Sequence, residues 1–556
     1  MPTVASSFVH HIKKLGVTHV FGIPGKSIVP LLMECEEQSI QFILSRHESG
    51  AGFQASGYAL KNQTIGVAMG TSGPGGTNLI TAAGQAKAFY LPVIFITGHP
   101  SMKNTGRPLA QDSTPFGTDM VTLFESVTKF SARVERGDLF PIYFKHALER
   151  ALTGAKGPVH LSIPLDVLLE DVGAFDVLSE QKRFPLTSEG IQAVIPLIEQ
   201  AQNPVMILGK GVHSAFAYEE IRSFSEHWNI PVVTTPGGKG TFPTNHPLSL
   251  NSFGLGGTEQ AEAYLRSGID LMIVIGSQLN DMSTAGFTTD MYPANVIHFD
   301  YEPTFIQKAL PVPTCFIQGD IKHNIGELLK LAEPKEKTSI YSEEIYRQVS
   351  AAIDEHEVEL APPASSSPAP CFISAVEAVR ALRKSLPSHT VIFGDEGSHS
   401  FYAIQNFDIY EPGTFFFDAA FGTMGYSLSY AIGAKVASPT DIVACLCGDG
   451  SIFMHGTEIS TAVNENIAAI FIVFNNSRLD MVDKGMSNHF KKAVGTVYTT
   501  GVDIKKFAES LGANAFRCHT EKEISLSVHN ALLHNGPTVI EIMVDPFEVP
   551  PTLLRG

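Results

Sequence analysis

The sequence has few cysteines, few basic residues and no long apolar run, and each shortage excludes a class of protein. Lys and Arg number 39 against 56 Asp and Glu, and the resulting net charge of −17 repels nucleic acid and anionic lipid. No apolar run reaches the roughly 18 to 20 residues of a membrane span, and the N-terminal residues lack a signal-peptide core. The six cysteines are scattered as reduced thiols usually are: Cys35, Cys315, Cys371, Cys445, Cys447 and Cys518. We therefore predict a cytoplasmic protein with no nucleic-acid and no membrane partner.

Length and patterning indicate several α/β domains. A chain of 556 residues exceeds what one hydrophobic core usually serves, and 44% hydrophobic with 17% charged residues is an ordinary globular balance. From Thr18 onward, short apolar runs such as THVFGIPG, TIGVAMG and LPVIFITGH alternate with amphipathic helical stretches. This alternation predicts βαβ units. We expect an α/β fold with three doubly wound parallel-sheet domains.

Shifts in composition suggest the domain bounds. A polar stretch, SEQKRFPLTSEG, follows the first α/β block, and a Pro/Ser/Ala-rich stretch, EHEVELAPPASSSPAP, precedes the last. The second composition favours an extended connection. We predict an N-terminal domain over 1–172, a central domain over 187–335, a linker over 355–370 and a C-terminal domain over 371–556.

The most informative motifs are GDGS and NN, each at the end of an apolar strand. Residues 448–451 form a turn into a helix, where flexible glycines and a helix N-terminus favour a phosphate. Asp449 is a hard oxygen ligand for Mg²⁺, and Asn475 and Asn476 end the next strand. Either motif alone is explained by an ordinary polar turn. The pair at this separation favours one shared site, because ligands gather at the carboxyl ends of parallel strands.

These residues resemble the cofactor motif of the thiamine diphosphate-dependent enzymes, specifically the acetolactate synthase-like group that includes pyruvate oxidase and benzoylformate decarboxylase. The resemblance covers almost the whole chain in the same three-domain order. It implies thiamine diphosphate and Mg²⁺ as cofactors, with Asp449, Asn476 and the backbone carbonyl of Arg478 as metal ligands. It implies further cofactor contacts from Ser398, His399, Gly422, Met424, Gly448, Asp449, Gly450, Ser451, Asn476 and Met481.

The first domain carries the complementary residues. Glu48, in RHESGAGFQ, stands where a strand passes into a helix, a position at which a glutamate usually serves as a helix-start charge. The resemblance instead makes Glu48 the glutamate that hydrogen-bonds N1′ of the aminopyrimidine and handles the activating proton. It also implies cofactor contacts from Pro24, Thr71 and Asn78.

Two further residues are catalytic candidates. Lys26, in PGKS, is either a surface lysine or an ammonium that steadies a substrate carboxylate. Gln111, in LAQDS, resembles the active-site glutamine of the family, although the spacing after it is longer. Because Glu48 and Asp449 belong to different domains, the resemblance implies a homodimer with shared active sites, or a tetramer.

The reaction that the resemblance implies is 2-keto acid decarboxylation with carboligation. FGIPGKS, YEP and DMV look closest to the acetolactate synthases, with pyruvate as donor. Two departures concern the biosynthetic synthases: Gln278 replaces an arginine expected to bind the acceptor carboxylate, and residues 480–485 lack the tryptophan of their GMVxQW motif. Those synthases bind FAD, and the altered middle-domain segment around Gln278 argues against FAD here.

Three alternatives to a carboligase can be considered, and the sequence argues against the last two. A 2-keto acid decarboxylase or an acyloin or aldehyde lyase would use the same cofactor and the same classes of small substrate, 2-keto acids and aldehydes. A non-catalytic paralogue has no chemical need for Glu48. A Rossmann dehydrogenase would need a G-x-G-x-x-G turn between strand and helix, which the sequence lacks.

Overall fold

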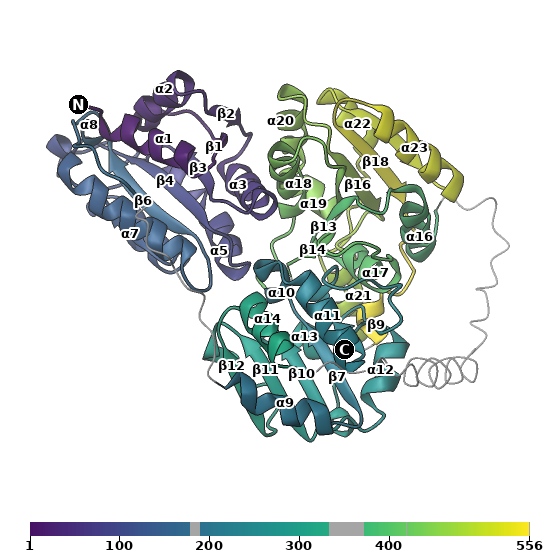
Figure 1. The fold of residues 1–556 in the computed structure, drawn as a ribbon. Helices are drawn as coiled ribbons and strands as arrows, with labels where there is room; N and C mark the ends of the chain where they lie inside the picture. Colours follow the sequence, from purple (N-terminus) through teal and green to yellow (C-terminus); the bar gives the residue numbers. More distant parts are fainter. Residues whose placement is uncertain (178–189, 333–371, 419, 555–556) are drawn as a thin grey trace.

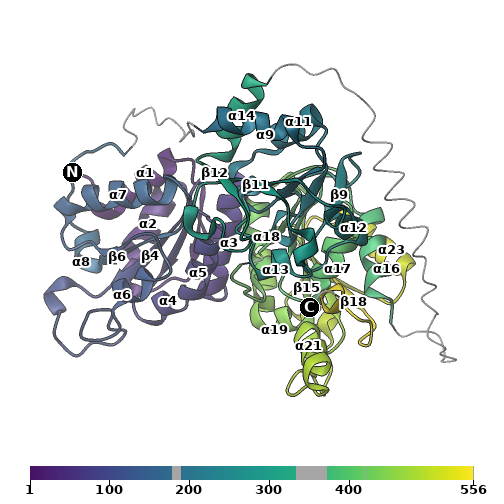
Figure 2. The same cartoon turned by 90° about the horizontal axis from the view of Figure 1, so that it is seen from below.

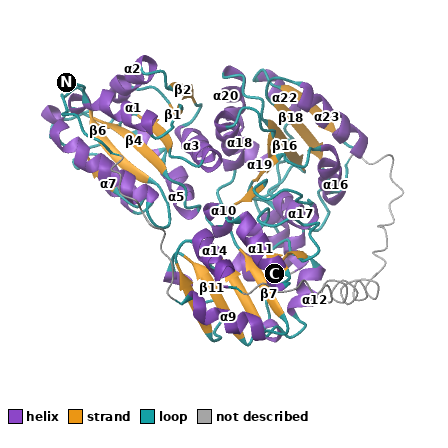
Figure 3. Ribbon diagram, in the orientation of Figure 1, coloured by secondary structure: helices purple, strands orange, loops and turns teal. Residues whose placement is uncertain are grey.

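The chain forms three α/β domains, each built on a six-stranded parallel sheet. The structure is a computed structural model that describes residues 1–177, 190–332, 372–418 and 420–554. In Figure 1 the first domain is purple to blue, the central domain is teal and the third is green to yellow. Figure 3 shows helices covering both faces of each sheet, as the doubly wound prediction requires. No helix within these described ranges is long and apolar enough to cross a bilayer.

The first domain orders its strands β2-β1-β3-β4-β6-β5. Its strands are β1 (His19–Gly22), β2 (Gln41–Leu44), β3 (Gly66–Gly70), β4 (Val93–His99), β5 (Ser131–Arg133) and β6 (Val159–Pro164). Its helices are α1 (Val4–Lys14), α2 (Val29–Glu37), α3 (Glu48–Asn62), α4 (Pro74–Thr77), α5 (Ile80–Ala88), α6 (Met120–Glu125), α7 (Phe140–Leu152) and α8 (Leu165–Leu168).

The third domain repeats this strand order, as β14-β13-β15-β16-β18-β17. Its strands are β13 (Val391–Gly394), β14 (Phe415–Phe417), β15 (Val443–Gly448), β16 (Ile470–Asn475), β17 (Asn514–Cys518) and β18 (Thr538–Met543). Its helices are α16 (Ala375–Ser385), α17 (Ser398–Asn406), α18 (Tyr426–Ala437), α19 (Asp449–His455), α20 (Ile459–Asn464), α21 (Asp480–Phe490), α22 (Ile504–Ser510) and α23 (Glu521–Leu533).

The central domain has a different order, β12-β11-β10-β7-β8-β9. Its strands are β7 (Pro204–Leu208), β8 (Val232–Thr234), β9 (Ser249–Ser252), β10 (Leu271–Ile275), β11 (Asn295–Asp300) and β12 (Thr314–Gln318). Its helices are α9 (Ile191–Gln200), α10 (Gly211–Ala215), α11 (Tyr218–Trp228), α12 (Glu259–Leu265), α13 (Asp281–Thr284) and α14 (Ile321–Leu331).

The predicted fold class is confirmed. The strands that no apolar run in the sequence had indicated all lie at the edges of their sheets. β5, β9, β12 and β17 all lie at sheet edges, where burial is incomplete and the sequence carries no continuous apolar run. The predicted linker over 355–370 lies outside the described residues, and the domain bounds stay predictions.

The first and third domains share one hydrophobic core. Helix α3 packs against α18, and Figure 2 shows the two helices side by side. A Cβ atom at Gly57 would collide with the backbone of Tyr430, and one at Gly433 with the backbone of Gln54, so only glycine permits this approach. Phe53 and Tyr430 belong to the same buried cluster. Helix α3, which begins at Glu48, is thereby held between two domains.

Candidate cofactor site

A cavity of about 230 Å³ lies at the carboxyl ends of the central strands of the third domain. Strands β13, β15 and β16 are neighbours in that sheet, so the turns that follow them converge. Every lining residue lies between 375 and 545. The lining includes every third-domain residue that the sequence suggested for cofactor or metal: Ser398, His399, Gly422, Met424, Gly448, Asp449, Gly450, Ser451, Asn476, Arg478 and Met481.

Asp449 is the buried anion of this cavity. Its side chain is 4% exposed, its Oδ1 accepts the N–H of Gly450 at 2.8 Å, and its Oδ2 has no hydrogen-bond partner among the described residues. Burial raises the pKa of Asp449 to about 6, although the backbone N–H groups of residues 476–478 face the carboxylate and oppose that rise. A buried, unpartnered carboxylate oxygen in a cavity that Asn476 also lines fits a hard divalent cation.

Two more side chains present unpartnered polar atoms here. Ser398 Oγ and His399 Nε2 are both buried, line the cavity and find no hydrogen-bond partner within the part of the chain that the structure describes. Burial lowers the pKa of His399 to about 3, so the imidazole is neutral. A Cβ atom at Gly450 would lie 2.7 Å from Leu479 Cδ2 and 2.9 Å from Met424 Cε. The residues therefore fit a diphosphate that approaches the backbone closely and uses these donors.

The cavity also contains Glu396, which sequence reasoning missed. Its side chain is buried, lines the cavity, and has Oε1 without a partner among the described atoms. Burial and the nearby charges of Asp418 and Asp395 raise the pKa of Glu396 well above its ordinary value. A neutral carboxylic acid at this position can donate a hydrogen bond. The only signal in the sequence was its place directly after an apolar strand, in GDEGSHS.

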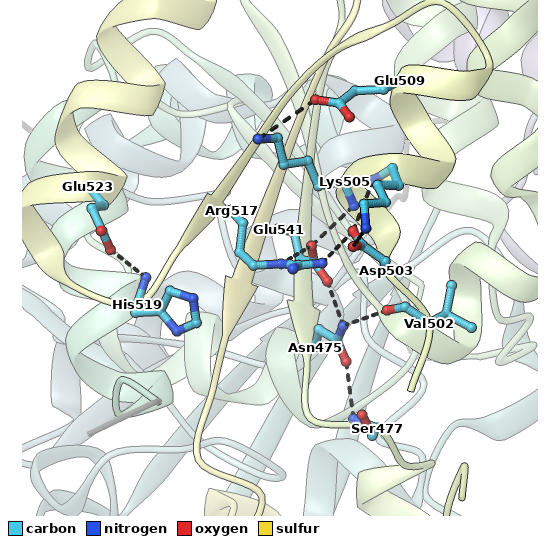
Figure 4. Close-up of polar contacts among 11 residues, drawn as sticks. Asn475, Ser477, Val502, Asp503, Lys505, Glu509, Arg517, His519, Glu523 and Glu541 are labelled. Carbon is cyan, nitrogen blue, oxygen red and sulfur yellow. Dashed lines mark hydrogen bonds and ion pairs between the residues drawn. The ribbon is translucent and has the colours of Figure 1, made fainter. Parts of the chain in front are cut away.

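Behind the cavity, Glu541 on β18 holds the Asn475–Asn476 turn. Figure 4 shows the Asn475 side chain between Glu541 and Ser477. Glu541 is fully buried and accepts from Asn475 Nδ2 at 2.7 Å and Arg517 Nε at 2.8 Å, while Asn475 Oδ1 accepts the N–H of Ser477 at 3.1 Å. Ser477 has the left-handed φ of 59°. These bonds fix the backbone from which Asn476 projects.

The first-domain candidates gather at the carboxyl ends of β1, β2 and β3, which are adjacent strands. Glu48 is 8% exposed, and its Oε2 accepts from Asn78 Nδ2 at 2.9 Å. The loop of Pro24 and Lys26 lies against Thr71 through Gly25. Gln111 packs against Gly73, within the same TSGPGG loop as Thr71, and has the left-handed φ of 55°.

The two groups do not meet within one chain. Glu48 and the other first-domain candidates are not among the described residues that line the third-domain cavity. Apolar side chains next to that cavity remain exposed: Phe453 by 48%, Met454 by 53% and Val482 by 51%. These exposed side chains belong to α19 and α21, two helices whose first residues line the cavity.

A second cavity, of about 380 Å³, lies at the carboxyl edge of the central sheet. Gln278 lines it and donates from Nε2 to Tyr90 of the first domain at 2.7 Å. Lys210 also lines it, and its Nζ donates to the Ala88 carbonyl. The structure thus places Gln278 at a boundary between domains and outside the third-domain cavity.

Comparison with known proteins agrees with this geometry. Sequence models described as "Thiamine pyrophosphate enzyme" match at three places: the N-terminal TPP binding domain over 2–120, the central domain over 191–328 and the C-terminal TPP binding domain over 395–542. The chain is 30% identical to a probable acetolactate synthase large subunit of Methanocaldococcus jannaschii, covering 99% of this chain and 93% of the relative. It is 29% identical to the acetolactate synthase isozyme 2 large subunit of Escherichia coli, covering 97% and 95% respectively. It is 30% identical to the acetolactate synthase large subunit of Corynebacterium glutamicum, covering 98% and 87%.

Proposed function

Because the chain belongs to the thiamine pyrophosphate (thiamine diphosphate) enzyme family as an acetolactate synthase-like member, we propose that it is a Mg²⁺-dependent 2-keto acid decarboxylase and carboligase. Pyruvate is the donor in this proposal, and a second 2-keto acid or an aldehyde is the acceptor. The observation that carries it is the convergence of three unpartnered polar atoms, on Asp449, Ser398 and His399, in one cavity.

In the proposed site, Mg²⁺ is held by Asp449, the side chain of Asn476 and the backbone carbonyl of Arg478. Ser398 and His399 donate to the diphosphate. The hydroxyl of Ser451 donates to Asp395 Oδ1 at 2.8 Å, so Ser451 would use its backbone N–H at the start of α19, while Gly450, whose N–H donates to Asp449 Oδ1, would provide the close approach. Gly422, Met424 and Met481 line the remaining wall, where the rings of the cofactor would lie.

Glu48 is the proposed proton-handling residue. When bound, thiamine diphosphate supplies a carbon nucleophile and an electron sink for loss of CO₂. Asn78 Nδ2 holds Oε2 of Glu48 at 2.9 Å, which leaves Oε1 to share a proton with N1′ of the aminopyrimidine. Lys26 and Gln111, which lie on the same edge of the first domain, are proposed to contact the substrate.

The proposed enzyme is a homodimer, or a tetramer made of two such dimers, in which Glu48 of one subunit reaches the third-domain cavity of its partner. Two observations support this arrangement. Among the described residues, the cavity lining comes only from the third domain, and the exposed Phe453, Met454 and Val482 offer an apolar surface to a second copy. The proposal includes no FAD, since Gln278 stands in a middle-domain segment that departs from the motif of the FAD-binding synthases.

Product analysis tests this proposal. Purified protein is supplied with thiamine diphosphate, Mg²⁺ and pyruvate, and CO₂ and carbon products are followed together. We expect CO₂ with acetolactate. Absence of CO₂ from pyruvate and from a panel of other 2-keto acids, with the cofactor demonstrably bound, would contradict the proposal.

A decarboxylase or aldehyde lyase with the same cofactor is the second candidate. Glu396 favours it, because a buried carboxylic acid kept neutral by its raised pKa can give a proton to the product carbon and release an aldehyde. Acetaldehyde in place of acetolactate in the same assay would support this candidate over the carboligase.

A further inference from the structure

A fully buried glutamate of the third domain, Glu458, reaches across the domain boundary to the residues that precede Glu48. Glu458 ends the short helix η7 (Gly456–Glu458), which joins α19 to α20. Its Oε1 accepts the backbone N–H of Arg46 at 3.0 Å and that of His47 at 2.9 Å. Figure 1 shows α3 of the first domain facing α20 of the third. A side chain from one domain therefore binds the backbone just before the helix that begins with the proposed catalytic residue of another, while the His47 side chain caps that helix by accepting from Ser49 N–H.

The second oxygen of Glu458 completes the attachment. Oε2 accepts from Gln54 Nε2 at 2.8 Å and from Thr461 Oγ1 at 2.8 Å. Gln54 lies on α3, and its own Oε1 accepts from Ser45 Oγ at 2.7 Å. One carboxylate thus ties together both sides of the strand-to-helix turn that carries Glu48.

The space for this carboxylate is provided by Gly50. A Cβ atom at Gly50 would collide with Oε1 of Glu458. Gly50 therefore permits the close approach, and a methyl group there would displace the carboxylate from Arg46 and His47.

The Glu458 carboxylate is surrounded by neutral hydrogen-bond donors: two backbone N–H groups, an amide and a hydroxyl. Burial raises its pKa, and the four hydrogen bonds to Oε1 and Oε2 oppose that rise. The Arg46 guanidinium donates to Ser460 Oγ at 2.6 Å and so does not neutralise Glu458. The N-terminus of α3 favours an anion at this position, and the four donors hold both oxygens of the carboxylate.

We propose that Glu458 is a positioning residue for Glu48. By fixing the backbone of Arg46 and His47, it sets the direction in which the Glu48 carboxylate leaves the start of α3. The contacts place Glu458 on the backbone before Glu48, while Glu48 itself is held by Asn78. This inference rests on the proposed function, because it needs Glu48 to handle a proton of the cofactor.

The test compares Glu458→Gln, Glu458→Asp and Gly50→Ala in the full-length holoenzyme. The rate at which the C2 proton of bound thiamine diphosphate exchanges with deuterium is measured by NMR after acid quench, beside Mg²⁺–cofactor affinity and the thermal midpoint. Because small misplacement of a catalytic group is costly, Glu458→Gln lowers exchange by about 10- to 100-fold, with affinity changed by less than about threefold. Glu458→Asp keeps the charge and recovers part of the rate. Gly50→Ala also lowers exchange, because the added methyl group displaces the Glu458 carboxylate from Arg46 and His47.

Glu465→Gln is the matched control. Glu465 also crosses the domain boundary, accepting from Gln41 Nε2 at 3.2 Å, but among the described residues its carboxylate forms no hydrogen bond with Arg46 or His47. We expect wild-type exchange in this variant.

Wild-type exchange in a folded Glu458→Gln protein would overturn the proposal, as would a loss of exchange that only parallels a loss of cofactor affinity. If Glu458→Gln does not fold, wild-type exchange in both Glu458→Asp and Gly50→Ala overturns it. The Glu48→Gln variant distinguishes a failure of the proposed function from a failure of the present inference. If that variant exchanges at the wild-type rate, the proposed function fails; if it loses exchange while Glu458→Gln keeps it, only the present inference fails.

Discussion

Replacing Glu48 with glutamine is expected to lower 2-keto acid turnover by about 100-fold or more, because general acid–base catalysis contributes that much. Glutamine has the shape of glutamate, so the hydrogen bond that joins Glu48 Oε2 to Asn78 can be kept through the amide oxygen. It cannot exchange a proton with N1′ of the aminopyrimidine. The proposed diphosphate and metal contacts are all on the third domain, and thiamine diphosphate should therefore stay bound.

Steady-state kinetics and cofactor titration of the purified Glu48→Gln protein measure the two quantities separately. Glu37→Gln is the matched control, since Glu37 lies exposed at the end of α2 in the same domain. Turnover of Glu48→Gln within twofold of the wild type would remove the catalytic assignment of Glu48.

Replacing Asp449 with alanine is expected to abolish Mg²⁺-dependent binding of thiamine diphosphate. Loss of a group outside the first coordination shell typically costs about 10- to 100-fold in metal affinity, and loss of a direct ligand should cost at least as much. The apoprotein should keep its thermal midpoint, because the deletion removes a buried carboxylate whose Oδ2 has no partner among the described residues. Loss of binding can then be distinguished from loss of fold.

The measurement is a titration of metal-free protein with thiamine diphosphate at several Mg²⁺ concentrations, with and without chelator. Asp441→Ala is the control, because Asp441 lies in the same domain and forms a salt bridge with Lys61 at 2.5 Å, away from the cavity lining. Unchanged cofactor affinity in Asp449→Ala would exclude Asp449 as a metal ligand.

Most of the third-domain site could be predicted from local sequence. GDGS and NN each follow an apolar strand, and parallel strands that are neighbours bring such turns together. Asp449, Asn476, Ser398 and His399 accordingly line one cavity. Their chemical roles stay predictions, because the resemblance, and not the strand pattern, supplied them.

Contacts between domains could not be predicted in the same way. Glu458 stands in GTEIS, a helical stretch with no visible signal, and it meets Arg46 and His47 only because α3 packs against α18. That packing depends on Gly57 and Gly433, whose need for close approach appears only when both domains are present. Glu396 was missed for a related reason, since its raised pKa depends on burial in the folded domain and on the charge of Asp418, which is distant in sequence.

The shared active site is the central claim, and mixing two inactive variants tests it most directly. Differently tagged Glu48→Gln and Asp449→Ala proteins are dissociated, mixed, reassembled with thiamine diphosphate and Mg²⁺, and assayed for CO₂ release after the hybrid is isolated. If each site takes Glu48 from one subunit and Asp449 from the other, the isolated hybrid has about half of wild-type activity, since one of its two sites is intact. A hybrid that contains both chains and the bound cofactor but releases no CO₂ would contradict the account.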